Sequence, residues 1–348
     1  MDLLDRAVAT SLQRLVLAAA LLLIPAQRSV AAVKTDLVEL RNGDRITCEI
    51  RKLERGKLTV KTDGIGTVAI EWDDVQYLAS TASYDIELRS GERVFGSLER
   101  GDAGSVVVTV PPGRRRLELG DVVRVVPVGG TFWRRLDGKV DAGFNFTQAD
   151  VQTQWSFHTD VSYRSRQWLT ALSADSALLS SEDVAGQLRN SLSLRSQRFI
   201  GMRWSTLGFA QLQQNEELSL ALRAVLGGGV QRVLRQSNRT VFALLGGAAL
   251  TREQYSGESV DTVTEAVAGA TWGWFTFDGR STNLDSSVLT FYGINRTRAR
   301  LELNSSFKSD IVGDLYWSIN VFESYTSDPP EDGKSNDFGI SAAIGWSF

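Results

Sequence analysis

The sequence contains very little cysteine or histidine, since Cys48 and His158 are the sole examples among its 348 residues. A single cysteine excludes an internal disulfide and a cysteine-based metal site. A single histidine excludes a histidine-rich metal cluster. We therefore expect no metal ion and no other cofactor, and no residues that serve to bind either.

The sequence also lacks an excess of positive charge and, after residue 32, a long apolar segment. Its 38 lysines and arginines face 41 acidic residues, whereas a nucleic-acid-binding protein usually has a strong basic excess. The most apolar run, residues 241–250, has ten residues including two glycines, and a membrane-spanning helix needs about 20. We expect no nucleic-acid partner, and such a chain can cross a membrane only as a closed barrel.

The first 32 residues have the pattern of an export signal. Arg14 precedes an apolar run over residues 15–24, and the small residues Ala31 and Ala32 stand before the expected cleavage point. This combination is typical of a secretory signal peptide. We predict a signal peptide over 1–32, and the alternative is a buried N-terminal helix.

Residues 36–79 and 84–128 resemble each other. The segment from Val38 to Ile46 matches the segment from Ile86 to Val94, displaced by 48 positions. In the first segment Asn42-Gly43 separates alternating apolar residues, which is a strong hairpin signal. We predict two tandem repeats of an SH3-like or Sm-like β-domain, followed by a linker over 129–137. This domain is either a periplasmic docking module or a spacer.

From residue 138 to the end, long segments alternate apolar and polar residues and are separated by short polar turns. In the last segment Phe338, Ile340 and Ile344 share one face, and Gly339 and Ser341 share the other. Lipid outside and water inside require this alternation in a membrane barrel, although a soluble β-sandwich also alternates. We predict an all-β fold with a twelve-stranded antiparallel transmembrane barrel over 138–348. Its strands are expected at 138–147, 153–164, 167–178, 187–199, 202–213, 218–234, 239–252, 263–277, 284–295, 298–309, 314–325 and 337–348.

Tryptophans gather at one end of these predicted strands. Trp168, Trp204 and Trp317 lie near the starts of outward strands, and Trp274 and Trp346 lie near the ends of returning ones. Aromatic rings prefer the membrane interface, where an apolar body and a polar edge are both satisfied. We expect an aromatic girdle at the periplasmic rim, beside turns that carry Arg164, Arg166, Arg198, Arg235 and Arg239.

The last strand ends in Trp346-Ser347-Phe348. Outer-membrane barrels resemble one another in a final strand that ends on an aromatic residue and is read by the barrel-assembly machinery. A free terminal strand can be recognised by strand addition through its unpaired backbone groups. We therefore expect that machinery as a partner, although Ala343 stands where glycine is usual.

Several short motifs then carry a family resemblance. They are Gly247-Ala-Ala-Leu-Thr-Arg-Glu253, Leu315-Tyr-Trp317, Asp328-Pro-Pro330 and Gly345-Trp-Ser-Phe348. Over residues 138–348 the chain resembles the YdiY-like salt-induced outer-membrane proteins, a family of unknown function. The resemblance implies an outer-membrane barrel, and it brings no substrate and no catalytic residues.

An enzymatic function is not favoured. His158 is the sole candidate imidazole base, and alternation places it beside Ser156, Asp160 and Ser162 on the polar face, away from lipid. A hydrolase would need a nucleophile and an orienting partner within hydrogen-bond reach of it. We predict no catalytic residues, and an outer-membrane lipid hydrolase is the least favoured interpretation.

We predict a non-enzymatic outer-membrane barrel of a Gram-negative bacterium that forms a small passive pore, with its N-terminal domain in the periplasm. Twelve strands give an interior between filled eight-stranded barrels and open porins. The alternative is a structural or adhesive envelope protein whose tandem domain docks a periplasmic protein or peptidoglycan. The residues expected to face the interior are Asp175, Arg189, Arg195, Arg300, Glu302 and Lys308.

Overall fold

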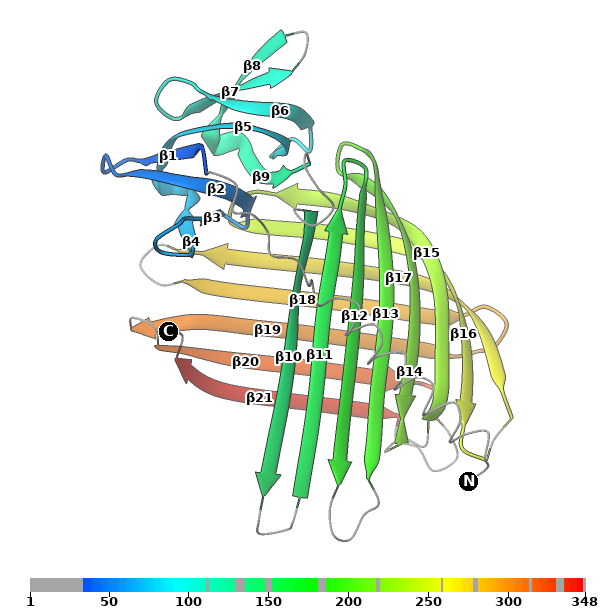
Figure 1. Cartoon of the computed structure of the whole chain (residues 1–348). Helices are drawn as coiled ribbons and strands as arrows, with labels where there is room; N and C mark the ends of the chain where they lie inside the picture. Colours follow the sequence, from blue (N-terminus) through cyan, green and yellow to red (C-terminus); the bar gives the residue numbers. More distant parts are fainter. Residues whose placement is uncertain are drawn as a thin grey trace.

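The computed structural model consists of two antiparallel β-sheets that follow one another along the chain (Figure 1). Within the part of the chain that the structure describes, no helix is long and apolar enough to cross a membrane. The predicted signal peptide, most of the predicted linker and the last two residues lie outside the described residues. The described ranges are 34–110, 113–128, 135–147, 152–180, 186–216, 220–257, 259–277, 281–312, 315–329 and 335–346.

The first sheet, called the small sheet below, has nine strands and holds the two sequence repeats, called unit one (36–79) and unit two (84–128). Short 3-10 turns, η1 (Trp72–Asp74) and η2 (Leu119–Asp121), precede the last strand of each unit. The strands are β1 (Asp36–Leu40), β2 (Arg45–Glu54), β3 (Lys57–Lys61), β4 (Thr67–Glu71), β5 (Val75–Leu88), β6 (Arg93–Arg100), β7 (Ser105–Val110), β8 (Gly113–Glu118) and β9 (Val122–Pro127).

The strand pairings repeat from one unit to the other. In unit one Val38 pairs with Ile46 and with Leu78, and in unit two Ile86 pairs with Val94 and with Val125. Strand β5 belongs to both units, because its first half closes unit one and its second half opens unit two. The units are also joined by backbone pairing, since β9 of unit two pairs with β2 of unit one at Leu53. The duplication seen in the sequence is therefore a duplication of backbone pairing.

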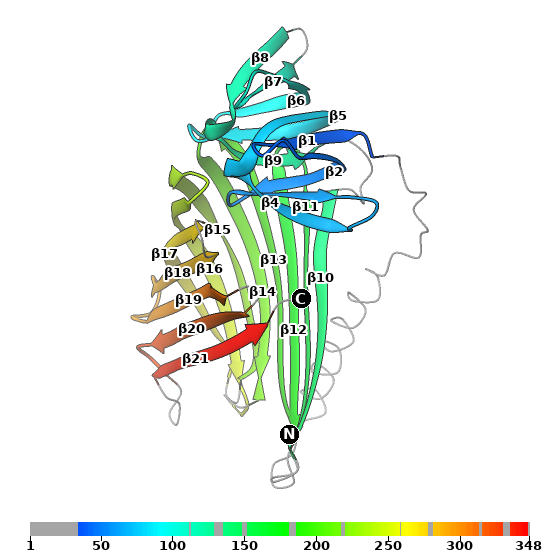
Figure 2. The ribbon, with the colours of Figure 1, turned by 90° about the vertical axis from the view of Figure 1, so that its left-hand side faces the viewer.

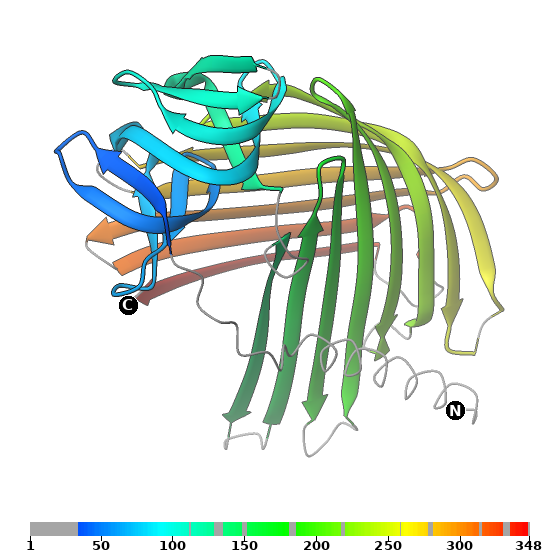
Figure 3. The same ribbon diagram turned by 45° about the horizontal axis from the view of Figure 1, so that its top comes forward.

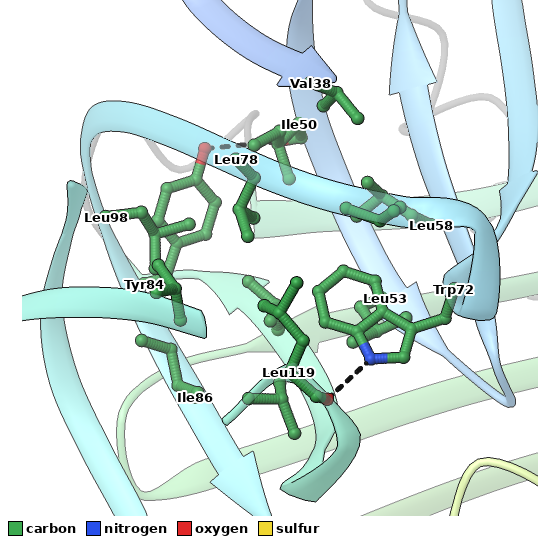
Figure 4. Packing of buried hydrophobic residues seen from close by; sticks show 14 of the residues in the cluster. Val38, Ile50, Leu53, Leu58, Trp72, Leu78, Tyr84, Ile86, Leu98 and Leu119 are labelled. Atoms are coloured by element: carbon green, nitrogen blue, oxygen red, sulfur yellow. Dashed lines mark hydrogen bonds between the residues drawn. The ribbon is translucent and has the colours of Figure 1, made fainter. Parts of the chain in front are cut away.

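The two units share one apolar core (Figure 4). Trp72 of unit one donates its indole N–H to the carbonyl oxygen of Leu119 in unit two at 2.8 Å, and these two residues occupy equivalent repeat positions. Tyr84 and Ile86 pack in the same cluster and are fully buried. A unit of fewer than 50 residues has too little core to stand alone, so each unit completes the other.

Cys48 lies in this core and is fully buried. Burial disfavours the thiolate and, together with the negative charge of Asp36, raises the pKa of Cys48 to about 12. The side chain is therefore a small apolar packing group at neutral pH.

The second sheet, called the large sheet below, has twelve strands, each paired antiparallel with the next. The all-β prediction and the large antiparallel sheet are thus confirmed, and the observed strand limits lie within about three residues of the predicted ranges. The strands are β10 (Leu136–Thr147), β11 (Gln152–Arg164), β12 (Trp168–Ser180), β13 (Gln187–Gly201), β14 (Trp204–Asn215), β15 (Leu220–Gln236), β16 (Thr240–Tyr255), β17 (Asp261–Thr276), β18 (Thr282–Gly293), β19 (Ala299–Val312), β20 (Leu315–Thr326) and β21 (Asn336–Trp346).

The large sheet curls so strongly that its two halves form opposite walls (Figure 2). Strands β10 to β13 run across the direction of β18 to β21 (Figure 1). Glycines allow close approach within the curl, because a Cβ on Gly229 or Gly247 would lie 2.3 or 2.2 Å from a carbonyl oxygen of the facing strand. Within the described residues, no pairing joins β10 to β21.

The two faces of the large sheet differ in chemistry. Residues paired across strands lie on the same face, and one row of such partners crosses eight strands and is polar throughout. We call the face that carries this row the inner face. The row consists of Asp141, His158, Asp175, Ser191, Gln213, Arg223, Glu253 and Asp261.

The opposite, outer face is apolar and exposed. The adjacent partners Phe144 and Trp155 are 58% and 56% exposed, although both are large apolar residues. The same face continues around the whole sheet, and a soluble monomer rarely exposes so large an apolar surface. Its exposed members include Trp168, Leu178, Leu194, Leu226, Val230, Leu244, Leu250, Trp272, Trp274, Tyr292, Trp317, Phe338, Ile340 and Ile344.

Candidate functional site at the junction of the two sheets

The small sheet lies over one end of the large sheet (Figure 3). It contacts the turns between β11 and β12, between β13 and β14, between β15 and β16, and between β17 and β18. Alternate turns of an antiparallel sheet lie at the same end, which explains why these four turns gather there. We call this end of the large sheet the covered end.

Unit one contacts the covered end through the turn between β2 and β3. Arg55 donates two hydrogen bonds to Asp285 on β18, each 2.6 Å long. This bidentate contact raises the pKa of Arg55 in spite of its partial burial, so the guanidinium stays charged. The next residue, Gly56, has a φ of +71°, and a Cβ there would lie 2.6 Å from the carbonyl oxygen of Asn238. Glycine therefore permits both the turn and its close approach to the large sheet.

Unit one makes further polar contacts around this turn. Lys52 forms an ion pair of 2.6 Å with Asp137 at the start of β10. Lys57 lies with its ammonium group 4.3 Å from the centre of the Phe277 ring, a cation–π geometry. Contacts to both β10 and β18 mean that unit one reaches opposite walls of the large sheet.

Unit two contacts the covered end through its first hairpin. Arg203, in the turn between β13 and β14, donates a hydrogen bond of 2.7 Å to the carbonyl oxygen of Arg89. Gly91 has a φ of +87°, and a Cβ there would lie 2.4 Å from Cγ of Arg203. Asn238 adds a bond of 3.0 Å to the carbonyl oxygen of Val122.

A buried carboxylate anchors unit two. Asp85 is 1% exposed and pairs with Arg93 of the same unit and with Arg164 at the end of β11. Arg93 also donates a bond of 2.8 Å to the carbonyl oxygen of Arg166. A buried charge must be paired to be tolerated, so this contact holds the two sheets in a fixed relation.

A cavity of about 590 Å³ lies between the two sheets. Its lining includes Arg55 and Arg124 from unit one and unit two, and Asp285, Asn304 and Asn320 from the inner face of the large sheet. Hydroxyl and amide groups lie beside Phe275 and Phe322 in the inner-face lining, and water can wet the polar part of this surface. The small sheet therefore covers this space without filling it.

The structure brings His158 together with two carboxylates on the inner face. Its ring nitrogens lie 2.6 Å from Asp160 and 2.5 Å from Asp175, and pairing places Ser156 and Ser162 on the same face. Both ring nitrogens are thus engaged by carboxylates. Within the described residues no serine hydroxyl shares a hydrogen bond with this ring, and no group of His, Cys, Asp and Glu is arranged to hold a metal ion.

The remaining residues expected in the interior also pair on the inner face. Arg300 forms an ion pair of 2.7 Å with Glu265, Arg195 donates a bond of 3.3 Å to Gln231, and Lys308 lies over the Tyr316 ring. The strand register places Asp175, Arg189 and Glu302 on the same face.

Sequence reasoning missed two features of this inner face. Glu253 is bound by Arg223 at 2.9 Å and by Arg298 at 2.8 Å, near the end away from the small sheet. An apolar cluster lies beside Glu253. We had expected a polar inner face throughout, and this cluster is an exception. Alternation identifies these residues as inward-facing, but it does not show which ones meet. The cluster consists of Val225, Ala249, Val267 and Phe291.

Four of the five tryptophans expected in the girdle are described with their side chains, and each is exposed on the outer face. They are Trp168, Trp204, Trp274 and Trp317. All four lie at the covered end of their strands. The side chain of Trp346 lies outside the described residues.

Residues 140–348 match the model of a family described as "Protein of unknown function, DUF481". This segment includes nearly all of the large sheet and none of the small sheet. No curated protein matches the chain.

Proposed function

The chain belongs to the DUF481 family, and we propose that it is a non-enzymatic β-barrel protein of a Gram-negative outer membrane, with a passive pore covered on its periplasmic side. In this proposal the large sheet closes into a twelve-stranded transmembrane barrel. The small sheet is a pair of SH3-like domains in the periplasm. The resemblance to YdiY-like outer-membrane proteins agrees with this assignment.

The observation that carries the proposal is the exposed apolar outer face. Rows of paired residues that are apolar outside and polar inside extend across the sheet, as in Phe144 with Trp155 against Asp141 with His158. Exposed apolar surface of this extent is stable against hydrocarbon and unfavourable against water. A tilted strand needs roughly 9–11 residues to cross a membrane. The strands of the large sheet have 11 to 17 residues and are therefore long enough.

Closure of the barrel follows from the same physics. An open edge strand in lipid would leave its N–H and C=O groups without partners, at a cost of several kcal/mol each. Strands β10 and β21 are the two edges of the large sheet, and pairing them would satisfy both. An even number of strands places the two ends of the sheet antiparallel, as in bacterial barrels.

The pore is proposed from the covered end. The space beneath the small sheet is about 590 Å³ in volume and has serine and asparagine side chains in its lining, but hydrogen bonds of Arg55 and Arg93 hold the small sheet across it. Farther inside, the ion pairs of Glu253 and Glu265 occupy part of the interior. We infer a narrow channel with low conductance while the small sheet stays in place.

The experiment compares the full chain with Arg55→Ala. Membrane fractionation should place both in the outer membrane, and both should migrate differently on a gel before and after boiling, because a closed strand ladder resists detergent. In planar bilayers the variant should have a higher conductance than the unsubstituted chain, since the hydrogen bonds between Arg55 and Asp285 that hold the small sheet in place are lost. A chain that stays monomeric without detergent would overturn the barrel, and equal conductance would overturn the covering role of the small sheet.

A second function is a docking role of the small sheet, favoured by strand β8. This strand is an edge of the small sheet and lies far from the large sheet (Figure 1). Its Arg114 is 71% exposed, and an exposed edge strand can pair with an added strand of a partner. A periplasmic protein or anionic peptidoglycan suits this edge. Capture of such a partner by the full chain, lost with Arg114→Glu, would support this role.

A further inference from the structure

A second cavity lies outside the large sheet, where the small sheet meets the outer face of β16 and β17. Its volume is about 880 Å³, and both sheets contribute to its walls. We call it the rim groove. Its walls include Phe242 and Trp274 of the outer face, which do not line the cavity beneath the small sheet. Its main lining residues are Arg89, Arg235, Arg239, Phe242, Trp272 and Trp274.

One wall of the rim groove is basic. Arg235 is exposed, and no carboxylate in the described part of the chain forms an ion pair with it. Arg239 faces Asp73 at 3.4 Å. Arg89 donates to the carbonyl oxygen of Gly120 and lies 4.0 Å from Asp121. The three arginines and two aspartates leave a net charge of +1. Among the described residues, Arg235 is the arginine of this wall that has no carboxylate beside it.

The other wall of the rim groove is aromatic. Trp272 and Trp274 are 45% and 38% exposed, and Phe242 pairs with Trp272 across β16 and β17. Trp272 donates its indole N–H to Thr240 at 3.2 Å, which fixes its ring. This wall continues directly into the apolar outer face through Leu244. A ligand of the rim groove would therefore meet cations at one side and hydrocarbon-like surface at the other.

We propose that the rim groove binds a phospholipid whose headgroup carries a net negative charge. The phosphate would accept hydrogen bonds from Arg235 and Arg239, since arginine presents a planar fork that matches phosphate oxygens. The acyl chains would lie along the outer face below Trp272 and Trp274, at the level where aromatic rings meet headgroups. This inference rests on the proposed membrane location, and it adds a specific lipid class and its binding residues.

Neighbouring strands extend the same chemistry around the rim. The guanidinium of Arg232 lies 5.1 Å from the centre of the Trp204 ring, and Arg198 lies 5.6 Å from Trp168. Both arginines are exposed on the outer face beside their tryptophans. These pairs do not line the rim groove, so we expect them to hold lipid more weakly. A lipid in the rim groove would contact both sheets at once.

The test uses the full chain in a neutral detergent and native mass spectrometry. Phosphatidylglycerol or phosphatidylcholine with identical acyl chains is added, and bound lipid is counted. The full chain should retain phosphatidylglycerol at least about ten-fold better than phosphatidylcholine. Each of Arg235→Gln and Arg239→Gln should weaken this retention about five-fold, the effect expected of one basic residue near an anionic headgroup.

Arg252→Gln is the matched control, because Arg252 is exposed on the outer face at the opposite end of β16. It should leave retention unchanged. Glycerol phosphate at the same concentration should not displace the lipid, which separates lipid binding from binding of a free phosphate. If Arg239→Gln disturbs folding, Arg235→Gln carries the test alone, since Arg235 forms no ion pair in the described region.

Equal retention of the two lipids, or an equal loss with Arg252→Gln, would overturn the rim groove as a specific site. Displacement of the lipid by glycerol phosphate would assign the site to a free anion and overturn the lipid proposal. These results differ from a failure of the membrane assignment. In that case the chain would stay monomeric without detergent and would show no heat-modifiable band.

Discussion

The two units of the small sheet have the same pairing but use different turns to contact the large sheet. Two glycines of unit one with positive φ, Gly43 and Gly56, have equivalents with positive φ in unit two, Gly91 and Gly104. Gly56 and Gly91 approach the large sheet closely, whereas a Cβ on Gly43 or Gly104 would meet nothing within 4 Å. Positive φ favours glycine in all four turns, and only one of the two glycine turns in each unit approaches the large sheet closely.

This difference follows from how the units pack. Trp72 and Leu119 are equivalent positions that meet each other across the shared core, so the units are related by an approximate rotation. Equivalent turns of the two units then point in opposite directions. The large sheet can therefore contact only one turn of each equivalent pair. Duplication followed by pairing therefore produces two different contacts from one repeated pattern.

The largest effect is expected at the buried anchor of unit two. Asp85→Ala leaves Arg93 and Arg164 without their shared carboxylate in a site where Asp85 is 1% exposed. Removal of one partner from a buried ion pair costs about 3–5 kcal/mol. We expect the free energy of unfolding of the small sheet to fall by this amount in urea titrations of the full chain.

Asp102→Ala is the control for this anchor, since Asp102 is 77% exposed and pairs with the exposed Arg116. An exposed ion pair contributes about 0–1 kcal/mol. The equivalent of Asp85 in unit one is Leu37, which has no charge to pair. A cost at Asp85 as small as that at Asp102 would show that the buried anchor does not hold unit two.

The four turn glycines provide a direct test of the comparison. Alanine at any of them costs about 1–2 kcal/mol, because an L-residue is strained at positive φ. Gly56→Ala should cost more, since its Cβ would lie 2.6 Å from a backbone oxygen of the large sheet. Gly91→Ala should cost an intermediate amount, because the side chain of Arg203 can move away.

The measurement for this series is limited proteolysis of the segment between the two sheets, together with urea unfolding. Gly56→Ala and Gly91→Ala should speed the proteolytic separation of the two sheets, and Gly43→Ala and Gly104→Ala should leave its rate unchanged. Four equal outcomes would mean that the close approaches at Gly56 and Gly91 contribute nothing to the junction.

Much of the fold was predictable from the sequence. The large sheet follows from strict alternation, because a strand that is wet on one face and apolar on the other has only one consistent register. The repeat gave the two units, and Asn42-Gly43 gave the position of a hairpin. Strand ends were predicted less closely, since β15 and β16 continue two or three residues past the predicted ranges.

The junction was not predictable in the same way. Arg55 and Asp285 are 230 residues apart in the sequence, and neither lies in a recognisable motif. Exposed charged residues at turns are common, so their pairing depends on how the sheets meet in space. The apolar cluster around Val225 and Phe291 was missed for a related reason, because alternation assigns a residue to a face but not to a neighbour.

A smaller effect is expected at the contact between the units. Trp72→Phe keeps an aromatic ring in the core but removes the hydrogen bond to the carbonyl oxygen of Leu119. The carbonyl oxygen of Leu119 still accepts the backbone N–H of Val122, so the variant loses one hydrogen bond, which contributes about 0.5–1.5 kcal/mol. The free energy of unfolding should fall by an amount in this range, and Trp72→Leu, which copies the residue of unit two, should cost more through the lost ring volume. No change with Trp72→Phe would show that the indole bond does not link the units.

The smallest effect concerns the equivalent carboxylates Glu39 and Glu87. Hydrogen bonding to Arg100, helped by the charges of Arg100 and Arg45, lowers the pKa of Glu39 from its ordinary value. A lowered pKa in the folded state adds stability that is fully present above the ordinary pKa of about 4.3 and is lost as the pH falls through the lowered pKa.

Arg100→Gln should therefore weaken the folded state at neutral pH and flatten its pH dependence below the ordinary pKa of a glutamate, about 4.3. The loss should be slight, because Arg100 is 44% exposed and water screens the pair. Urea unfolding at pH 7 measures the loss of stability, and the difference between the free energies of unfolding at pH 7 and pH 3 measures the pH dependence. Since only Glu39 has the Arg100 contact, a matching change in Arg114→Gln, which removes an exposed arginine elsewhere in unit two, would trace the effect to overall charge. An unchanged difference between the two pH values in Arg100→Gln would remove Glu39 as the source of acid sensitivity in unit one.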